Sequence, residues 1–174
     1  FKNDREDITY INCSNENELL AEFMVFWTKH YPDVLTGWNT EFFDVPYLIN
    51  RITKVLGEDR AKEFSPWGLI SSRIVYSHGR NQQVYDVTGI ANLDYLQLYR
   101  KFTYTNQESY ALNHIAFVEL GQKKLDHSEF DTFKDFYTKG WQKFIEYNII
   151  DVELVDRLEG KMKLIELALT MAYE

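Results

Sequence analysis

A stripe of apolar residues with helical spacing near the carboxyl end of the chain constrains its fold most. Asp151 lies at one end of this stripe, and Tyr147 precedes it by one helical turn. Intervals alternating between three and four residues mark a helix face that packs against a core. Burying an unpaired carboxylate is very costly, so an aspartate on such a face needs a cation, a metal ion or another strong partner. The apolar members of the stripe are Val155, Leu158, Met162, Ile165 and Leu169.

Two neighbouring acids do not share this stripe. Glu153 and Asp156 are rotated well away from it, which favours solvated positions for both. For Asp151 a structural explanation also stays open, in which a nearby backbone group or an arginine satisfies the carboxylate. Asp151 is therefore a candidate for chemistry, and a structural role is its alternative.

The composition is that of one globular domain. Of the 174 residues, 45% are hydrophobic and 16% aromatic, and only 8 are Gly and 3 Pro, which excludes disordered and collagen-like chains. No apolar run approaches the roughly 20 residues of a transmembrane helix, so no membrane partner is expected. The single cysteine cannot form an internal disulfide, which favours a cytoplasmic compartment.

The net charge of −8 argues against a free-standing nucleic-acid binder. It is compatible with an enzyme that meets nucleic acid through cations held by carboxylates. The chain begins at Phe1 rather than methionine, and it ends at Glu174 directly after a helical pattern. We therefore expect it to be part of a larger protein.

The order of hydrophobic patterns predicts an α/β domain with a mixed sheet. Strands are expected at residues 8–12, 34–38, 73–76 and 83–87, the last two forming a hairpin around a polar tip at 77–81. Helices are expected from Asn15 towards Pro32, at 45–56, 92–102 and 109–120, and at about 141–172 with a break near 147–149.

A second candidate segment connects the predicted strand at 34–38 to the predicted helix at 45–56. It reads Trp38-Asn39-Thr40-Glu41-Phe42-Phe43-Asp44. In the structural explanation, Asp44 caps the helix and Pro46 takes a favoured position in its first turn. Capping does not require an asparagine and an aromatic pair ahead of the aspartate, so Asp44 is also a candidate for chemistry.

Together the two candidate segments resemble the 3'-5' exonuclease domain of family B DNA polymerases. Trp38 to Asp44 matches the second exonuclease motif, and Tyr147 to Asp151 matches the third. The resemblance covers nearly the whole chain. Further segments look, in the same order, like the replicative polymerases of tailed bacteriophages: Leu35-Thr36-Gly37-Trp38-Asn39, Leu93-Asp94-Tyr95-Leu96, Lys101-Phe102 with Thr105-Asn106-Gln107, and Tyr147-Asn148-Ile149-Ile150-Asp151-Val152.

This resemblance implies a ribonuclease H-like mixed sheet flanked by helices, with an inserted β-hairpin, and residues 1–174 as a partial exonuclease domain of a larger DNA polymerase. The implied reaction is proofreading, the hydrolysis of the 3' terminal nucleotide of single-stranded DNA with two Mg²⁺ or Mn²⁺ ions. Asp44 and Asp151 would bind the metal ions, and Tyr147 would orient the attacking water.

The resemblance also implies contacts with DNA. Asn39 and Phe43 would contact the terminal nucleotide, and His78, Gly79 and Arg80 at the hairpin tip would help to separate the primer strand. An ordinary exposed turn is the alternative for this tip. The implied partners are the 3' end of single-stranded DNA or a primer–template and the other polymerase domains, in the cytoplasm of a host cell if the protein is viral.

One part of the family pattern is missing. The first exonuclease motif is an Asp-x-Glu on an apolar strand, and Asp4-Arg5-Glu6 is too close to Asp44 to replace it. Half of the four-acid set is then absent, so we expect the fragment to hold metal weakly and to cleave DNA poorly. The alternative function is an inactive ribonuclease H-like module that contacts DNA or another domain. Retention of Asp44 and Asp151 favours a nuclease.

Overall fold

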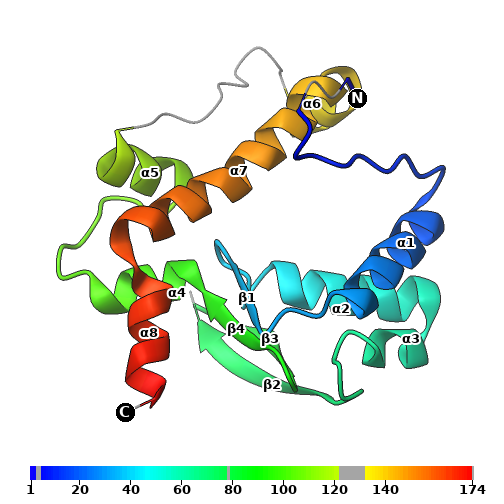
Figure 1. Cartoon of the computed structure of the whole chain (residues 1–174), viewed down its shortest axis with the longest axis horizontal. Coiled ribbons are helices and arrows are strands. Elements are labelled where there is room, and N and C mark those ends of the chain that lie inside the picture. The colour runs from blue at the N-terminus through cyan, green and yellow to red at the C-terminus, as the bar shows by residue number, and fades with distance from the viewer. Residues whose placement is uncertain (3–4, 78, 122–131, 174) are drawn as a thin grey trace. The chain divides into compact units, whose positions relative to one another are not determined.

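The structure is a computed structural model of the chain that describes residues 1–2, 5–77, 79–121 and 132–173 (Figure 1). It divides into two compact units. The sheet unit is Asn12–Gln97, and the helical unit combines Phe1–Ile11 with Leu98–Glu174.

Both helices and strands occur up to Asp94, and the described residues after it contain helices alone, which confirms the predicted α/β class. The sheet unit contains α1 (Glu16–Lys29), β1 (Val34–Gly37), α2 (Asp44–Leu56), α3 (Glu58–Lys62), β2 (Ile70–Ser77), β3 (Arg80–Val87) and β4 (Ala91–Asp94). After α4 (Tyr95–Phe102), the helical unit contains α5 (Leu112–Leu120), α6 (Phe133–Lys139), α7 (Trp141–Met162) and α8 (Leu164–Tyr173).

The strands of the sheet unit form two pairs. β2 and β3 are antiparallel, from Ile70 opposite Val87 to Ser77 opposite Arg80. β1 and β4 are parallel, and Gly37 at the end of β1 lies opposite Asp94 at the end of β4 (Figure 1). Since the carboxyl ends of parallel strands share one edge, the segment that leaves β1 starts beside Asp94.

The core of the sheet unit lies under α1 and α2. Helix α1 begins where predicted, because the Asn15 side chain accepts a hydrogen bond from the Glu18 amide while the Glu18 carboxylate accepts one from the Ser14 amide. Inside the core, the Trp27 ring stacks on Phe64 at 4.5 Å and donates its indole N–H to the Phe64 carbonyl at 2.8 Å. Val45, Ile49 and Ile52 of α2 belong to the same buried cluster, which holds the helix that begins at Asp44.

The helical unit is organised around α7, which packs against α5 and α6. Val155 and Leu158 are buried, as the apolar stripe predicts. The stripe is less buried in its distal part, where Leu169 is 36% exposed. None of the helices in the described part of the chain combines the length and the apolar character needed to cross a lipid bilayer.

Three expected elements differ from the structure. Residues 8–12 form no strand, because alternating polarity makes a strand only where a partner strand pairs with it. Residues 92–94 are strand rather than helix, because they pair with β1. The predicted break at 147–149 lies inside the continuous α7, and the helical path is interrupted at Lys163, whose φ of 55° is left-handed.

Candidate functional site

The segment between β1 and α2, residues 38–43, carries Asn39 and Phe43 and leads into Asp44. It leaves β1 through a tight turn, since a Cβ at Gly37 would lie 2.7 Å from Thr40 Cγ2. Asn39 has a φ of 71°, in the left-handed region that asparagine tolerates better than most residues. Its carbonyl accepts a hydrogen bond from the Phe43 amide at 3.0 Å, which closes the segment onto α2.

Asp94 is the buried acid beside this segment and is only 4% exposed. Its Oδ1 accepts hydrogen bonds from the amides of Asn39 and Leu96, both at 3.0 Å. Its Oδ2 accepts one from the amide of Glu41, also at 3.0 Å. Burial raises the pKa of Asp94, and these amide bonds offset part of the rise. The sequence motif contained Asp94, but without β4 nothing indicated that it would meet the 38–43 segment.

Asp44 is exposed at the first turn of α2. It does not cap the helix: the N-cap residue is Phe43, and no side chain makes a capping hydrogen bond there. Surrounding protein atoms nevertheless displace enough water from the carboxylate to raise its pKa. Asp94 raises it further, and a bond from the residue's own amide opposes the shift. Among the described residues no basic side chain forms an ion pair with Asp44.

An exposed carboxylate that lacks a protein counter-ion suits a hard divalent cation. Asp44 therefore fits the predicted role of a metal ligand. It does not complete a metal site within the described residues, where no group of three or more His, Cys, Asp or Glu residues is arranged to hold an ion.

Tyr147 and Asp151 lie one turn apart on α7, as predicted, and both are partly buried. The Tyr147 ring meets Phe136 edge-on, with centroids 5.5 Å apart and an interplanar angle of 86°. Asp151 belongs to the helical unit and Asp44 to the sheet unit, so their convergence on shared ions stays a prediction.

The two acids that were expected to lie off the stripe differ in exposure, since the Glu153 side chain is only 26% exposed. Asp156 is exposed, and Glu153 accepts hydrogen bonds from Arg5 and Arg157. Both arginine partners are about half exposed, so these ion pairs are surface interactions. Neither acid competes with Asp151 for a role on the buried face of α7.

Two aromatic rings flank Asp44 on the surface. Phe43 is 62% exposed and Tyr47, one turn further along α2, is 55% exposed. Their rings stack with centroids 6.2 Å apart and an interplanar angle of 11°. Sequence reasoning named Phe43 but missed Tyr47, although the four-residue interval between them is a helical signal.

The predicted DNA-contacting tip connects β2 to β3. The tip is shorter than expected, because β2 extends to Ser77 and β3 begins at Arg80. Arg80 and Gly79 are exposed, and Gly79 has a φ of 77°. His78 lies outside the described residues, as does Asp4 of the Asp4-Arg5-Glu6 segment. The DNA contacts of this tip stay a prediction.

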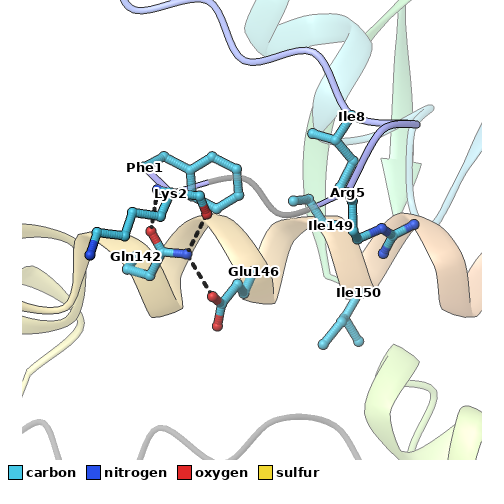
Figure 2. Close-up of a pocket in the computed structure, with 8 residues that line it drawn as sticks. All are labelled: Phe1, Lys2, Arg5, Ile8, Gln142, Glu146, Ile149 and Ile150. Atoms are coloured by element: carbon cyan, nitrogen blue, oxygen red, sulfur yellow. Dashed lines mark hydrogen bonds between the residues drawn. The ribbon is translucent and has the colours of Figure 1, made fainter.

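The helical unit also contains a groove of about 820 Å³, shown in Figure 2. Gln142 donates hydrogen bonds to the Lys2 carbonyl at 3.0 Å and to Glu146 at 2.7 Å. Tyr147 and Asp151 are not among its described lining residues. Those residues are Phe1, Lys2, Arg5, Ile8, Gln142, Glu146, Ile149 and Ile150.

Comparison with known proteins identifies the family that this chain matches and several similar polymerases. The family described as DNA polymerase family B, exonuclease domain, matches residues 2–115. The chain is 39% identical over 168 residues to the DNA-directed DNA polymerase of Escherichia phage RB69, which covers 97% of the chain and 18% of that relative. For the DNA-directed DNA polymerase of Enterobacteria phage T4 the identity is 37% over 166 residues, covering 95% of the chain and 18% of the relative.

A more distant relative is a cellular enzyme. The DNA polymerase delta catalytic subunit of Candida albicans is 30% identical over 158 residues, which cover 84% of the chain and 15% of that protein. The chain thus spans 18% or less of the length of these three polymerases.

Proposed function

The chain belongs to the exonuclease domain family of family B DNA polymerases, and we propose that it is a 3'-5' proofreading domain that acts within a DNA polymerase. Its substrate would be the 3' terminal nucleotide of single-stranded DNA, released as a nucleoside monophosphate. The observation that carries this proposal is Asp44, an exposed carboxylate without a basic partner among the described residues, within the matched segment.

Asp44 and Asp151 are the proposed ligands of two Mg²⁺ or Mn²⁺ ions. When bound, such ions activate water and stabilise the leaving 3' oxygen. A carboxylate binds a metal ion in its ionised form, so the raised pKa of Asp44 should make metal binding weaken in acid at a higher pH than for an ordinary aspartate. Tyr147 would use its phenol to orient the water that attacks the phosphorus, and Asn39 would position the terminal nucleotide.

Further proposed contacts concern the DNA strand. Phe43 and Tyr47 present a stacked, exposed aromatic surface beside Asp44, which suits stacking with an unpaired base. We assign the β2–β3 pair to the inserted hairpin of the family, with His78, Gly79 and Arg80 at the primer strand, and the β1–β4 pair to a ribonuclease H-like sheet. The other polymerase domains and a primer–template are the proposed partners, in the cytoplasm of a phage-infected cell.

An inactive ribonuclease H-like module is the second candidate function. Such a module would contact DNA or a polymerase domain without hydrolysis. Activity in a complete polymerase therefore distinguishes the two candidates.

A domain replacement tests the proposal. The homologous segment of the RB69 phage polymerase is exchanged for this chain, and digestion of a 5'-labelled single-stranded oligonucleotide is followed with Mg²⁺. We expect digestion from the 3' end, and a loss of about 100-fold or more in Asp44→Ala. Primer extension by the same enzyme is the control for folding. An enzyme that extends primers but digests no DNA would refute the exonuclease and favour the inactive module.

A further inference from the structure

We propose that Asp94 is a positioning residue, whose buried carboxylate holds the 38–43 segment by the amides of Asn39 and Glu41 and so places Asp44 at the start of α2. The contribution to exonuclease activity rests on the proposed function. The anchoring itself stands on the hydrogen bonds and can be measured without DNA or metal.

Asp94 binds backbone amides through both of its carboxylate oxygens. It is only 4% exposed, and its two oxygens accept three backbone hydrogen bonds at 3.0 Å, from Asn39, Glu41 and Leu96. Hydrogen bonds to an ionised acceptor are stronger than neutral ones. Two of the three donors belong to the 38–43 segment, so Asp94 is bound to the backbone of that segment, whereas Asp44 keeps an exposed carboxylate.

The 38–43 segment needs support from outside the segment. Asn39 has a φ of 71°, a region in which a residue with a side chain is less stable. The bond from its amide to Asp94 holds it there, and its carbonyl accepts the Phe43 amide at 3.0 Å. Phe43 directly precedes Asp44. A short series of hydrogen bonds thus connects Asp94 to the beginning of α2.

β4 holds the same segment at a second point. The Thr40 hydroxyl donates a hydrogen bond to Asn92 Oδ1 at 2.8 Å, and Thr40 is 5% exposed. Asn92 and Asp94 are two residues apart on β4, so both bonds depend on the β1–β4 register. The position of Asp44 is therefore set by side chains that need no contact with DNA or metal.

Amide hydrogen exchange of the 174-residue chain, read residue by residue by NMR, tests this role. In Asp94→Ala all three amides lose their acceptor, and their exchange should accelerate about 10-fold or more. In Asp94→Asn the remaining carbonyl oxygen can still serve Asn39 and Leu96, but an NH₂ group faces the Glu41 amide. We expect fast exchange at Glu41 and smaller changes at the other two.

This difference in exchange between Glu41 and the other two amides distinguishes anchoring from general destabilisation, which would accelerate exchange at all three amides together. Asp59→Asn is the matched control, because it makes the same chemical change in a side chain that is 98% exposed, and it should leave the three amides unchanged. If the Asp94 variants do not fold, scalar couplings across the hydrogen bonds from Asn39 and Glu41 to Asp94 Cγ in the unaltered chain decide. Absence of these couplings, or equal exchange in Asp94→Asn and Asp59→Asn, would overturn the proposal.

The effect of Asp94 on exonuclease activity is measured in the domain-replacement polymerase. Asp94→Asn should lower the exonuclease kcat about 10-fold or more while primer extension is unchanged, since the anchor affects the placement of Asp44 rather than the polymerase reaction. An exonuclease rate equal to that of the unaltered replacement would overturn the link to activity. If the replacement polymerase without substitutions digests no DNA, but Asp94→Asn still shows faster exchange at Glu41 than at the other two amides, the proposed function fails and the anchoring role stands.

Discussion

Replacing Gly37 by alanine should displace the 38–43 segment through a single identifiable contact. The added Cβ would lie 2.7 Å from the Thr40 methyl carbon, well inside the distance that carbon atoms normally keep. Thr40 is 5% exposed, so its side chain has little room to move away. Overpacking of this kind typically costs about 1–3 kcal/mol. We expect Gly37→Ala to lower the free energy of unfolding by that amount.

The second member of a double-mutant cycle identifies the clash. Thr40→Ser removes the methyl carbon but keeps the hydroxyl that bonds to Asn92. In this background Gly37→Ala should cost little, which gives a coupling energy of about 1–2 kcal/mol between the two positions. Urea unfolding of the 174-residue chain, followed by tryptophan fluorescence, measures all four proteins.

A glycine elsewhere provides the control. A Cβ at Gly160, inside α7, would meet nothing within 4 Å, so Gly160→Ala should stabilise the chain by about 0.5–1 kcal/mol through helix propensity. Equal effects of alanine at Gly37 and Gly160, or no rescue of Gly37→Ala by Thr40→Ser, would refute the argument that close approach to Thr40 makes glycine necessary at Gly37.

Three further predictions concern the predicted site. Because the pKa of Asp44 is raised in the folded state, its ionised form opposes folding. At pH 7 and without metal, Asp44→Asn should therefore unfold at a higher urea concentration than the unaltered chain. This difference should shrink towards about pH 3, where the carboxyl is protonated in both the folded and the unfolded state. Phe43→Ala should weaken binding of a short single-stranded oligonucleotide by about 1–3 kcal/mol in fluorescence anisotropy, whereas Tyr104→Ala, another exposed aromatic, should leave it unchanged. In NMR titrations with Mn²⁺, paramagnetic broadening should occur together around Asp44 and Asp151, and Asp151→Asn should abolish it at both residues. The control variant Glu153→Gln should retain the broadening. Broadening around Asp44 that survives Asp151→Asn would contradict shared ions.

Short-range signals made several elements predictable from the sequence. Asn15 and Glu18 are close in the chain and form the bonds that begin α1. Gly57 ends α2 because it adopts a φ of 96°, which other residues avoid. The helical interval between Tyr147 and Asp151 also held, since both lie on α7. In each case the determining contacts lie within a few residues, so the pattern alone carries them.

Long-range contacts explain what the sequence did not show. Residues 92–94 have a spacing compatible with a helix, and they become a strand only because they pair with β1, where Leu93 lies opposite Thr36. The Thr36 hydroxyl also donates a hydrogen bond to the Leu93 carbonyl, across 57 residues of the chain. Residues 8–12 show the reverse case, where alternating polarity without a pairing strand leaves them outside any sheet. Strand formation depends on a partner that local periodicity does not contain.

The same limit explains why Asp151 was found and Asp94 was not. Asp151 stands out because it continues the apolar face of Val155 and Leu158 on α7, whereas the place of Asp94 is set by the register that puts it opposite Gly37. That register brings it against the amides of the segment leaving β1, so Asp94 binds backbone while Asp44 keeps an exposed carboxylate. Substitution of Asp94 and substitution of Asp44 should both lower exonuclease activity, so activity alone does not distinguish a positioning residue from a metal ligand. Exchange at Asn39 and Glu41 must therefore be measured beside activity before Asp94 is counted as a metal ligand.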